Sequence, residues 1–115
     1  MTRKTRPISW IRAAEKDFNK FPNAVKTEMR TALTISAEGR RADKTKPLTG
    51  FSGVWEVALR YQTDAYRTIY VTEMGGSLWV LHAFKKKSKE GIKTPKPEID
   101  LVRERLKRLK KELMQ

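Results

Sequence analysis

The chain has 115 residues, of which 26 are lysine or arginine and 13 are aspartate or glutamate, giving a formal net charge of +13 at pH 7. This length suits a single domain, residues 1–115, with one modest core. The charge favours a polyanionic partner, nucleic acid before an anionic membrane. No apolar run approaches the ~20 residues that a membrane-spanning helix needs. We therefore expect a basic domain that binds nucleic acid and not a membrane.

The sequence contains no cysteine and one histidine. Disulfides and thiolate chemistry are therefore excluded, and a metal site built on histidine or cysteine is disfavoured. The N-terminus is basic but lacks the apolar stretch of a secretory signal. These features favour a cytoplasmic protein that uses neither a metal ion nor another cofactor.

The first half of the chain predicts a short strand, two helices and a loop. The apolar run 7–11 suits a strand that joins the later sheet, and residues 13–19 suit a brief helix. Pro22 can open a second helix that ends near Gly39, since proline is tolerated in the first turn and glycine after the last. We expect the two helices to form an α-hairpin across one face of the sheet. Residues 40–53, with Pro47, Gly50 and Gly53, are expected to be a loop.

The middle of the chain predicts an antiparallel meander. Three runs rich in β-branched and aromatic residues occupy 54–61, 65–72 and 77–84. Gly75-Gly76 between the second and third runs is a strong hairpin signal, because glycine accepts positive φ at little cost. The alternation of side chains along a strand places Arg67 with Ala65, Ile69 and Val71, and His82 with Val80 and Phe84.

The C-terminal residues 96–113 predict an amphipathic helix. Its apolar residues recur at spacings of three and four: Ile99, Val102, Leu106, Leu109 and Leu113. This seam either docks on the domain core, which we favour, or meets a partner chain, which would allow a homodimer. The predicted fold is thus α+β, with an N-terminal strand and α-hairpin packed on a small twisted antiparallel sheet, and a C-terminal helix.

Positive side chains gather at one end of this predicted sheet. Arg60 ends the first strand of the meander and Arg67 lies early in the second. The third strand returns to the same end and leads into Lys85-Lys86-Lys87, beside His82. Such a cluster suits a phosphate. RNA cleavage by its own ribose 2′-hydroxyl needs alignment, charge stabilisation on the phosphorane and two proton transfers, and cations meet the second need directly.

Each candidate also has a plainer interpretation. A single arginine or lysine near a strand end is usually a solvated charge, and this applies equally to the basic connector that contains Lys46. His82 is more often structural at such a place, although an imidazole can also carry a proton near neutral pH. Phe84 could stack on a base, but an aromatic residue in a small sheet usually belongs to the core.

Several short motifs, in order, resemble the RelE/ParE superfamily of bacterial toxins, in its HigB-like, phage-associated branch. They are the motif YR-x-x-Y at residues 66–70, WEVALR before it, LHAFKKK after it, K-P-L-x-G at residues 46–50 and K-T-P before the final helix. The resemblance implies a microbial-RNase-like fold and a ribosome-dependent mRNA endonuclease. It also implies cleavage by 2′-hydroxyl attack that leaves a cyclic phosphate, and a cognate helix-turn-helix antitoxin.

The resemblance also implies roles for individual residues. Arg67 matches the strand arginine that contacts the scissile phosphate, and Lys86 lies where a relative has a phosphate-stabilising arginine. Glu56 and Ala58 stand where RelE itself carries two lysines. The candidate catalytic residues are Arg67, Lys86, Lys85 and His82, and the candidate RNA-binding residues are Arg60, Lys87, Lys46 and Phe84. A ParE-like DNA gyrase inhibitor and a non-catalytic basic nucleic-acid-binding module are the alternatives.

Overall fold

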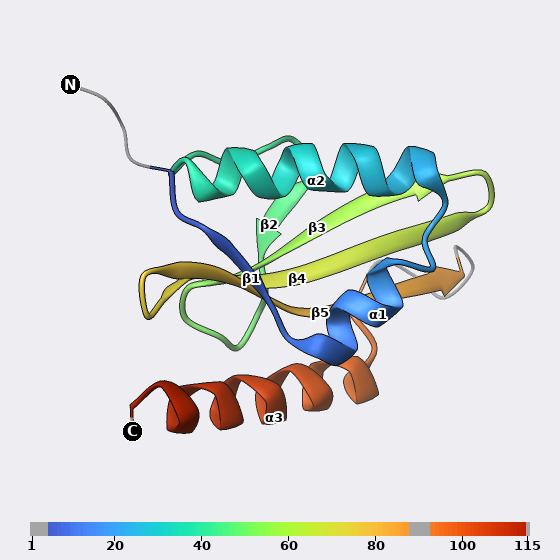
Figure 1. Ribbon diagram of the computed structural model, residues 1–115. Helices are drawn as coiled ribbons and strands as arrows, with labels where there is room; N and C mark the ends of the chain where they lie inside the picture. The colour runs from blue at the N-terminus through green and yellow to red at the C-terminus, as the bar shows by residue number, and fades with distance from the viewer. Residues whose placement is uncertain (1–4, 88–92, 115) are drawn as a thin grey trace.

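The structure, a computed structural model, describes residues 5–87 and 93–114. Three helices and five strands are formed by these residues, in the order β1 (Ile8–Trp10), α1 (Arg12–Phe18), α2 (Asn23–Ala37), β2 (Thr45–Pro47), β3 (Val54–Tyr61), β4 (Asp64–Met74), β5 (Ser77–Lys87) and α3 (Lys96–Leu113). The strands make one sheet in the order β1-β5-β4-β3-β2, which lies between α2 and α3 (Figure 1). The predicted α+β fold is confirmed.

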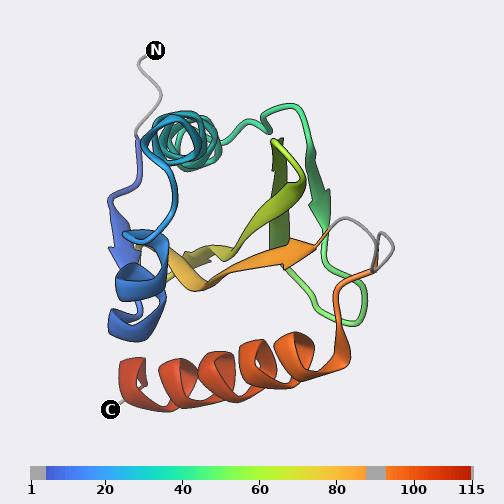
Figure 2. The same ribbon diagram turned by 90° about the vertical axis from the view of Figure 1, so that its right-hand side faces the viewer.

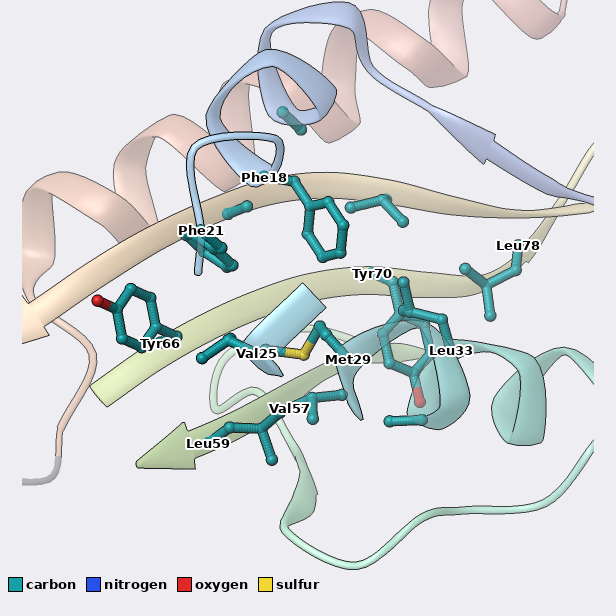
Figure 3. Packing of buried hydrophobic residues seen from close by; sticks show 14 of the residues in the cluster. Phe18, Phe21, Val25, Met29, Leu33, Val57, Leu59, Tyr66, Tyr70 and Leu78 are labelled. Carbon is teal, nitrogen blue, oxygen red and sulfur yellow. The ribbon is translucent and has the colours of Figure 1, made fainter. Parts of the chain in front are cut away.

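The first face of the sheet is apolar and is covered by α1 and α2. The second helix buries side chains at helical spacing, among them Val25, Met29 and Leu33, because this stripe points at the sheet. Figure 3 shows these side chains meeting Val57 and Tyr70. The Tyr70 hydroxyl is satisfied within this core by a hydrogen bond with the Ser36 hydroxyl, as a buried polar group requires.

The second face of the sheet is covered in part by α3, which lies on the side opposite α2 (Figure 2). Val102, Leu106 and Leu109 are buried there against the sheet, so the predicted seam docks on the domain core. Leu113, at the end of the seam, is 41% exposed. None of the helices in the described part of the chain is long and apolar enough to cross a membrane.

Two details of the sheet differ from the sequence prediction. The expected loop 40–53 contains a strand, β2, which pairs antiparallel with β3 and forms one edge of the sheet. Pro47 is tolerated in it because an edge strand has one side without ladder hydrogen bonds. At the other edge, β1 pairs with β5 in parallel, so the sheet is mixed and not wholly antiparallel.

The last strand is longer than predicted and its register is interrupted. It continues to Lys87, with Lys86 opposite Ala65 and Lys85 opposite Tyr66 on β4. Neighbouring lysines of this strand therefore point to opposite faces. Further back, Ile69 pairs with His82 and Tyr70 pairs with Val80, which leaves Leu81 as an extra residue. This bulge breaks the simple alternation predicted from the sequence and moves Val80 to the face opposite His82.

Candidate active site

A buried ion pair lies at the centre of the second face. Nη1 of Arg67 on β4 is 3.0 Å from Oε1 of Glu56 on β3. The side chains are diagonal neighbours, since Ala58 lies directly opposite Arg67, and both are long enough to bridge that distance. Arg67 is 5% exposed and Glu56 is 1% exposed. Away from water, each charge depends on the other for its stability.

The chain immediately before α3 lies against this pair. The Thr94 hydroxyl donates a hydrogen bond to Oε2 of Glu56 at 2.7 Å and accepts one from Nη1 of Arg67 at 3.3 Å. One residue earlier, the carbonyl of Lys93 accepts a hydrogen bond from the ammonium group of Lys86 on β5. Lys86 is 3% exposed. Two of the predicted catalytic cations, Arg67 and Lys86, therefore share one face and contact the same short segment.

A pocket of about 350 Å³ lies beside the ion pair, between β2 and the beginning of α3. Its lining includes Glu56 and Thr94 together with the cationic residues Lys46 and Lys93. Lys46 belongs to β2 and is directly opposite Glu56 in the ladder, so it comes from the sheet edge and not from a loop. The pocket thus combines one carboxylate, two threonine hydroxyls and two ammonium groups. Arg67 is hydrogen-bonded directly to two of the lining residues, Glu56 and Thr94.

The other predicted cations are divided between the two faces. Arg60 lies opposite Ala65, and Ala65 lies opposite Lys86, so Arg60 shares the face of the site and is exposed. Lys85 points to the other face, where its ammonium group is 3.8 Å from a carboxylate oxygen of Asp64. The side chain of Lys87 lies outside the described part of the structure. The prediction that Lys85 and Lys86 lie in one cluster beside His82 is therefore wrong, because β5 extends through them and consecutive side chains of a strand point to opposite faces.

His82 lies beneath α3 with both ring nitrogens engaged. Its Nε2 is 2.7 Å from Oε1 of Glu98, and its Nδ1 is 3.2 Å from Nη1 of Arg105. A guanidinium can only donate, so Nδ1 is the acceptor and Nε2–H donates to the carboxylate. The ring also stacks on Phe84 at a centroid distance of 5.0 Å. These contacts fit the structural role considered for His82 and the core role considered for Phe84; their catalytic and RNA-binding roles remain predictions.

Burial lowers the pKa of His82 below its ordinary value of 6.5, although the hydrogen bond that the ring donates to Glu98 raises it. Arg105 on α3 also lowers this pKa, whereas the charges of Glu98 and of Asp17 on α1 raise it. The ring is therefore neutral at physiological pH and joins the sheet to α3 as a hydrogen-bonded bridge.

Sequence reasoning did not assign a role in the site to Glu56, Lys93 or Thr94. Glu56 carries one available signal: a single carboxylate inside the apolar strand run VWEVAL must find a partner when it is buried. Thr94 lies in the K-T-P motif before the final helix, but this motif does not reveal its partners, because they are 27 and 38 positions away in the sequence. Within residues 5–87 and 93–114, no group of three or more histidine, cysteine, aspartate or glutamate side chains could hold a metal ion.

Comparison with solved structures places the fold of this chain in the RelE-like class. A mutant of the E. coli toxin RelE in the free state superposes with a TM-score of 0.63 and 18% identity, over 91% of this chain and 98% of that chain. The isolated E. coli RelE toxin gives a TM-score of 0.61 and 19% identity, over 90% and 98%. The RelE-like fold inferred from the sequence motifs is confirmed.

The family follows from the sequence. The model of the family described as "Phage derived protein Gp49-like" matches residues 16–107, and the chain belongs to this family. A comparison with curated protein sequences finds no match.

Titration of His82 should make the stability of the fold depend on pH. Its pKa is lower in the folded chain than in the unfolded one, so the unfolded state takes up the proton first as the pH falls. The free energy of unfolding should be unaffected above about pH 7 and should fall below it, by at most about 1.4 kcal/mol per pH unit, until the lowered pKa is passed. Urea unfolding between about pH 8 and about pH 5 measures this.

His82→Gln is the matched variant, because its amide can donate to Glu98 and accept from Arg105 without titrating. Acidic groups elsewhere affect both proteins alike, and His82 is the one histidine of the chain. The difference between the two pH profiles therefore isolates His82. Parallel profiles would show that the ring is not held neutral by its surroundings.

Proposed function

We propose that this protein is the toxin of a toxin–antitoxin pair and that it cuts mRNA on the ribosome as a metal-independent endoribonuclease. The observation that carries the proposal is the buried Glu56–Arg67 pair at the edge of the pocket, with Lys86 on the same face. Such a pair offers a proton acceptor beside a cation that can stabilise charge on a phosphate. Membership of the Gp49-like family and the RelE-like fold support the same assignment.

The reaction proposed for this site is attack of a ribose 2′-oxygen on the adjacent phosphorus. The 2′-hydroxyl proton passes to the Glu56 carboxylate, and a bond forms between the 2′-oxygen and phosphorus. The bond from phosphorus to the 5′-oxygen then breaks, leaving a 2′,3′-cyclic phosphate and a 5′-hydroxyl. Arg67 and Lys86 stabilise the charge on the phosphorane, and an ammonium group of the pocket, Lys46 or Lys93, returns a proton to the 5′-oxygen.

Charge on the rest of the domain supports a polyanionic substrate assembly. The net charge of +13 is spread over a small chain, and exposed cations such as Arg60 lie on the face of the site. Rim charges of this kind accelerate encounter and orient a nucleic acid without taking part in the chemistry. We assign Arg60 to this role, and Lys46 to binding of the mRNA backbone in addition to its proposed part in proton return.

The same charge leads us to infer that the cognate antitoxin has an acidic surface. The resemblance to the HigB-like branch implies that this antitoxin is a helix-turn-helix protein. Co-expression with the adjacent open reading frame should yield a stable complex and restore growth, because an acidic partner would neutralise the basic surface. Growth rate and co-purification from the same culture measure this. A stable complex in which the toxin remained fully active would contradict neutralisation by this partner.

Induced expression of the protein should arrest bacterial growth and produce cuts within translated mRNA. Mapping of mRNA 5′ ends measures the cleavage, and a translation-blocked culture controls for its dependence on the ribosome. Intact mRNA together with inhibited DNA gyrase would instead support the ParE-like alternative. Unchanged growth at high expression would contradict both toxin functions.

Arg67→Lys should lower the single-turnover cleavage rate by about 10²-fold, because the compact ammonium lacks the planar fork of donors with which the guanidinium can reach Glu56 and a phosphate together. Lysine is preferable to alanine here, since alanine would leave Glu56 buried without its cation at a cost of about 3–5 kcal/mol. The control is Arg108→Lys on α3, whose exposed guanidinium pairs with Glu104 at 3.1 Å. Equally small losses of cleavage rate in the two variants would show that this face is a basic surface and not an active site.

A further inference from the structure

Thr94 is the residue that joins the chain before α3 to the buried ion pair. Its hydroxyl donates to Oε2 of Glu56 at 2.7 Å and accepts from Nη1 of Arg67 at 3.3 Å. The same Nη1 also contacts Oε1 of Glu56 at 3.0 Å. The three side chains therefore form a closed ring of hydrogen bonds between β3, β4 and the segment before α3.

Only a hydroxyl or a water molecule can occupy the position of the Thr94 oxygen. The guanidinium of Arg67 can only donate, and the ionised carboxylate of Glu56 can only accept. A group placed between them must accept from the first and donate to the second, as a hydroxyl does. A water molecule would satisfy the same two groups but would not be tied to the chain.

The backbone on both sides of Thr94 is held in place. The preceding carbonyl, that of Lys93, accepts a hydrogen bond from the Lys86 ammonium. Pro95 follows, and a proline restricts the residue before it to an extended backbone. The β-branched side chain adds its own restriction on χ1. The hydroxyl is thus a rigid support, and it restricts rotation of the Glu56 carboxylate and of the Arg67 guanidinium.

We propose that Thr94 is a positioning residue for the cleavage reaction, holding the Glu56 carboxylate and the Arg67 guanidinium in the relative orientation that the reaction needs. This inference rests on the proposed function. Small misplacements of catalytic groups lower rates strongly, and a shift of about 1 Å can cost about 10²-fold. Without the hydroxyl, the ion pair remains but the Glu56 carboxylate can rotate. We therefore expect the cleavage rate to fall about 10-fold.

The test compares Thr94→Val, Thr94→Ser and the wild-type protein in single-turnover cleavage on translating ribosomes, with toxin in excess. Valine has the shape of threonine without the hydroxyl, and serine retains the hydroxyl. Thr94→Val should lower the plateau rate about 10-fold at an unchanged half-saturating toxin concentration, and Thr94→Ser should restore most of it. Thr31→Val is the control, because the hydroxyl of Thr31 is exposed and bonds only the Thr27 carbonyl within α2.

A merely structural role for Thr94 would give a different result. Partial unfolding lowers the fraction of active toxin, which raises the apparent half-saturating concentration but leaves the plateau rate at the wild-type value. Combining Thr94→Val with Arg67→Lys gives a second criterion: if Thr94 acts through the ion pair, the double variant should cleave about as fast as Arg67→Lys alone. If the losses of cleavage rate in the two single variants added fully in the double variant, the proposal would be overturned.

Two further outcomes would also overturn the inference. A wild-type plateau rate in Thr94→Val would show that the hydroxyl does not position the pair, while leaving the proposed function intact. A faster rate would show that the hydroxyl competes with substrate for Glu56 and Arg67. Absence of cleavage by the wild-type protein would instead refute the proposed function, and the positioning role with it.

Discussion

A carboxylate and a guanidinium lie buried side by side on one face of this sheet, and the arrangement of that face follows from their need for partners. Removal of a single charge from water costs several kcal/mol, so neither Glu56 nor Arg67 would be stable there alone. Their pairing leaves Oε2 of the carboxylate to be satisfied, and the Thr94 hydroxyl does so. The chain just before α3 therefore lies against the sheet at this point, and the helix begins two residues later, at Lys96.

One face of the sheet carries the main apolar core, and the other carries the candidate site. The first face is filled by the apolar side chains of α1 and α2 (Figure 3). The hydroxyls of Tyr70 and Ser36 form a hydrogen bond with each other within this core. On the other face, the apolar seam of α3 covers the part nearest the Leu81 bulge. The helix begins only at Lys96, so the rest of that face is left to charged side chains and to the pocket. A long helix docked off-centre thus provides both a core and a polar site.

The histidine bridge shows how the two parts of this second face are connected. His82 lies between the apolar contacts of α3 and the charged pocket, and it binds Glu98 and Arg105 from two successive regions of the helix. Because these partners require a neutral ring with one defined tautomer, they fix the orientation of the helix over β5. Rigidity there supports the residues that lie one turn earlier in the chain, next to the ion pair.

Much of this arrangement follows from local sequence patterns. The helix predicted at residues 96–113 has the bounds of α3, and the three meander strands were found, because hydrophobic periodicity is a property of neighbouring residues. Arg67 is predicted as a site residue from the short motif at residues 66–70. For Glu56 the sequence indicates only a difference from RelE. Its partner, Arg67, becomes apparent only when β3 and β4 are paired.

The sequence by itself determined the helices, the meander, the strong positive charge and the resemblance to RelE. Only the tertiary structure decided which charges come together. The extension of β5 through the lysine run separates Lys85 from Lys86, since consecutive side chains of a strand point to opposite faces. The bulge at Leu81 and the return of Thr94 to the ion pair depend on contacts between distant segments. Such contacts depend on the packing and hydrogen bonding of the whole chain, so local sequence propensities do not predict them.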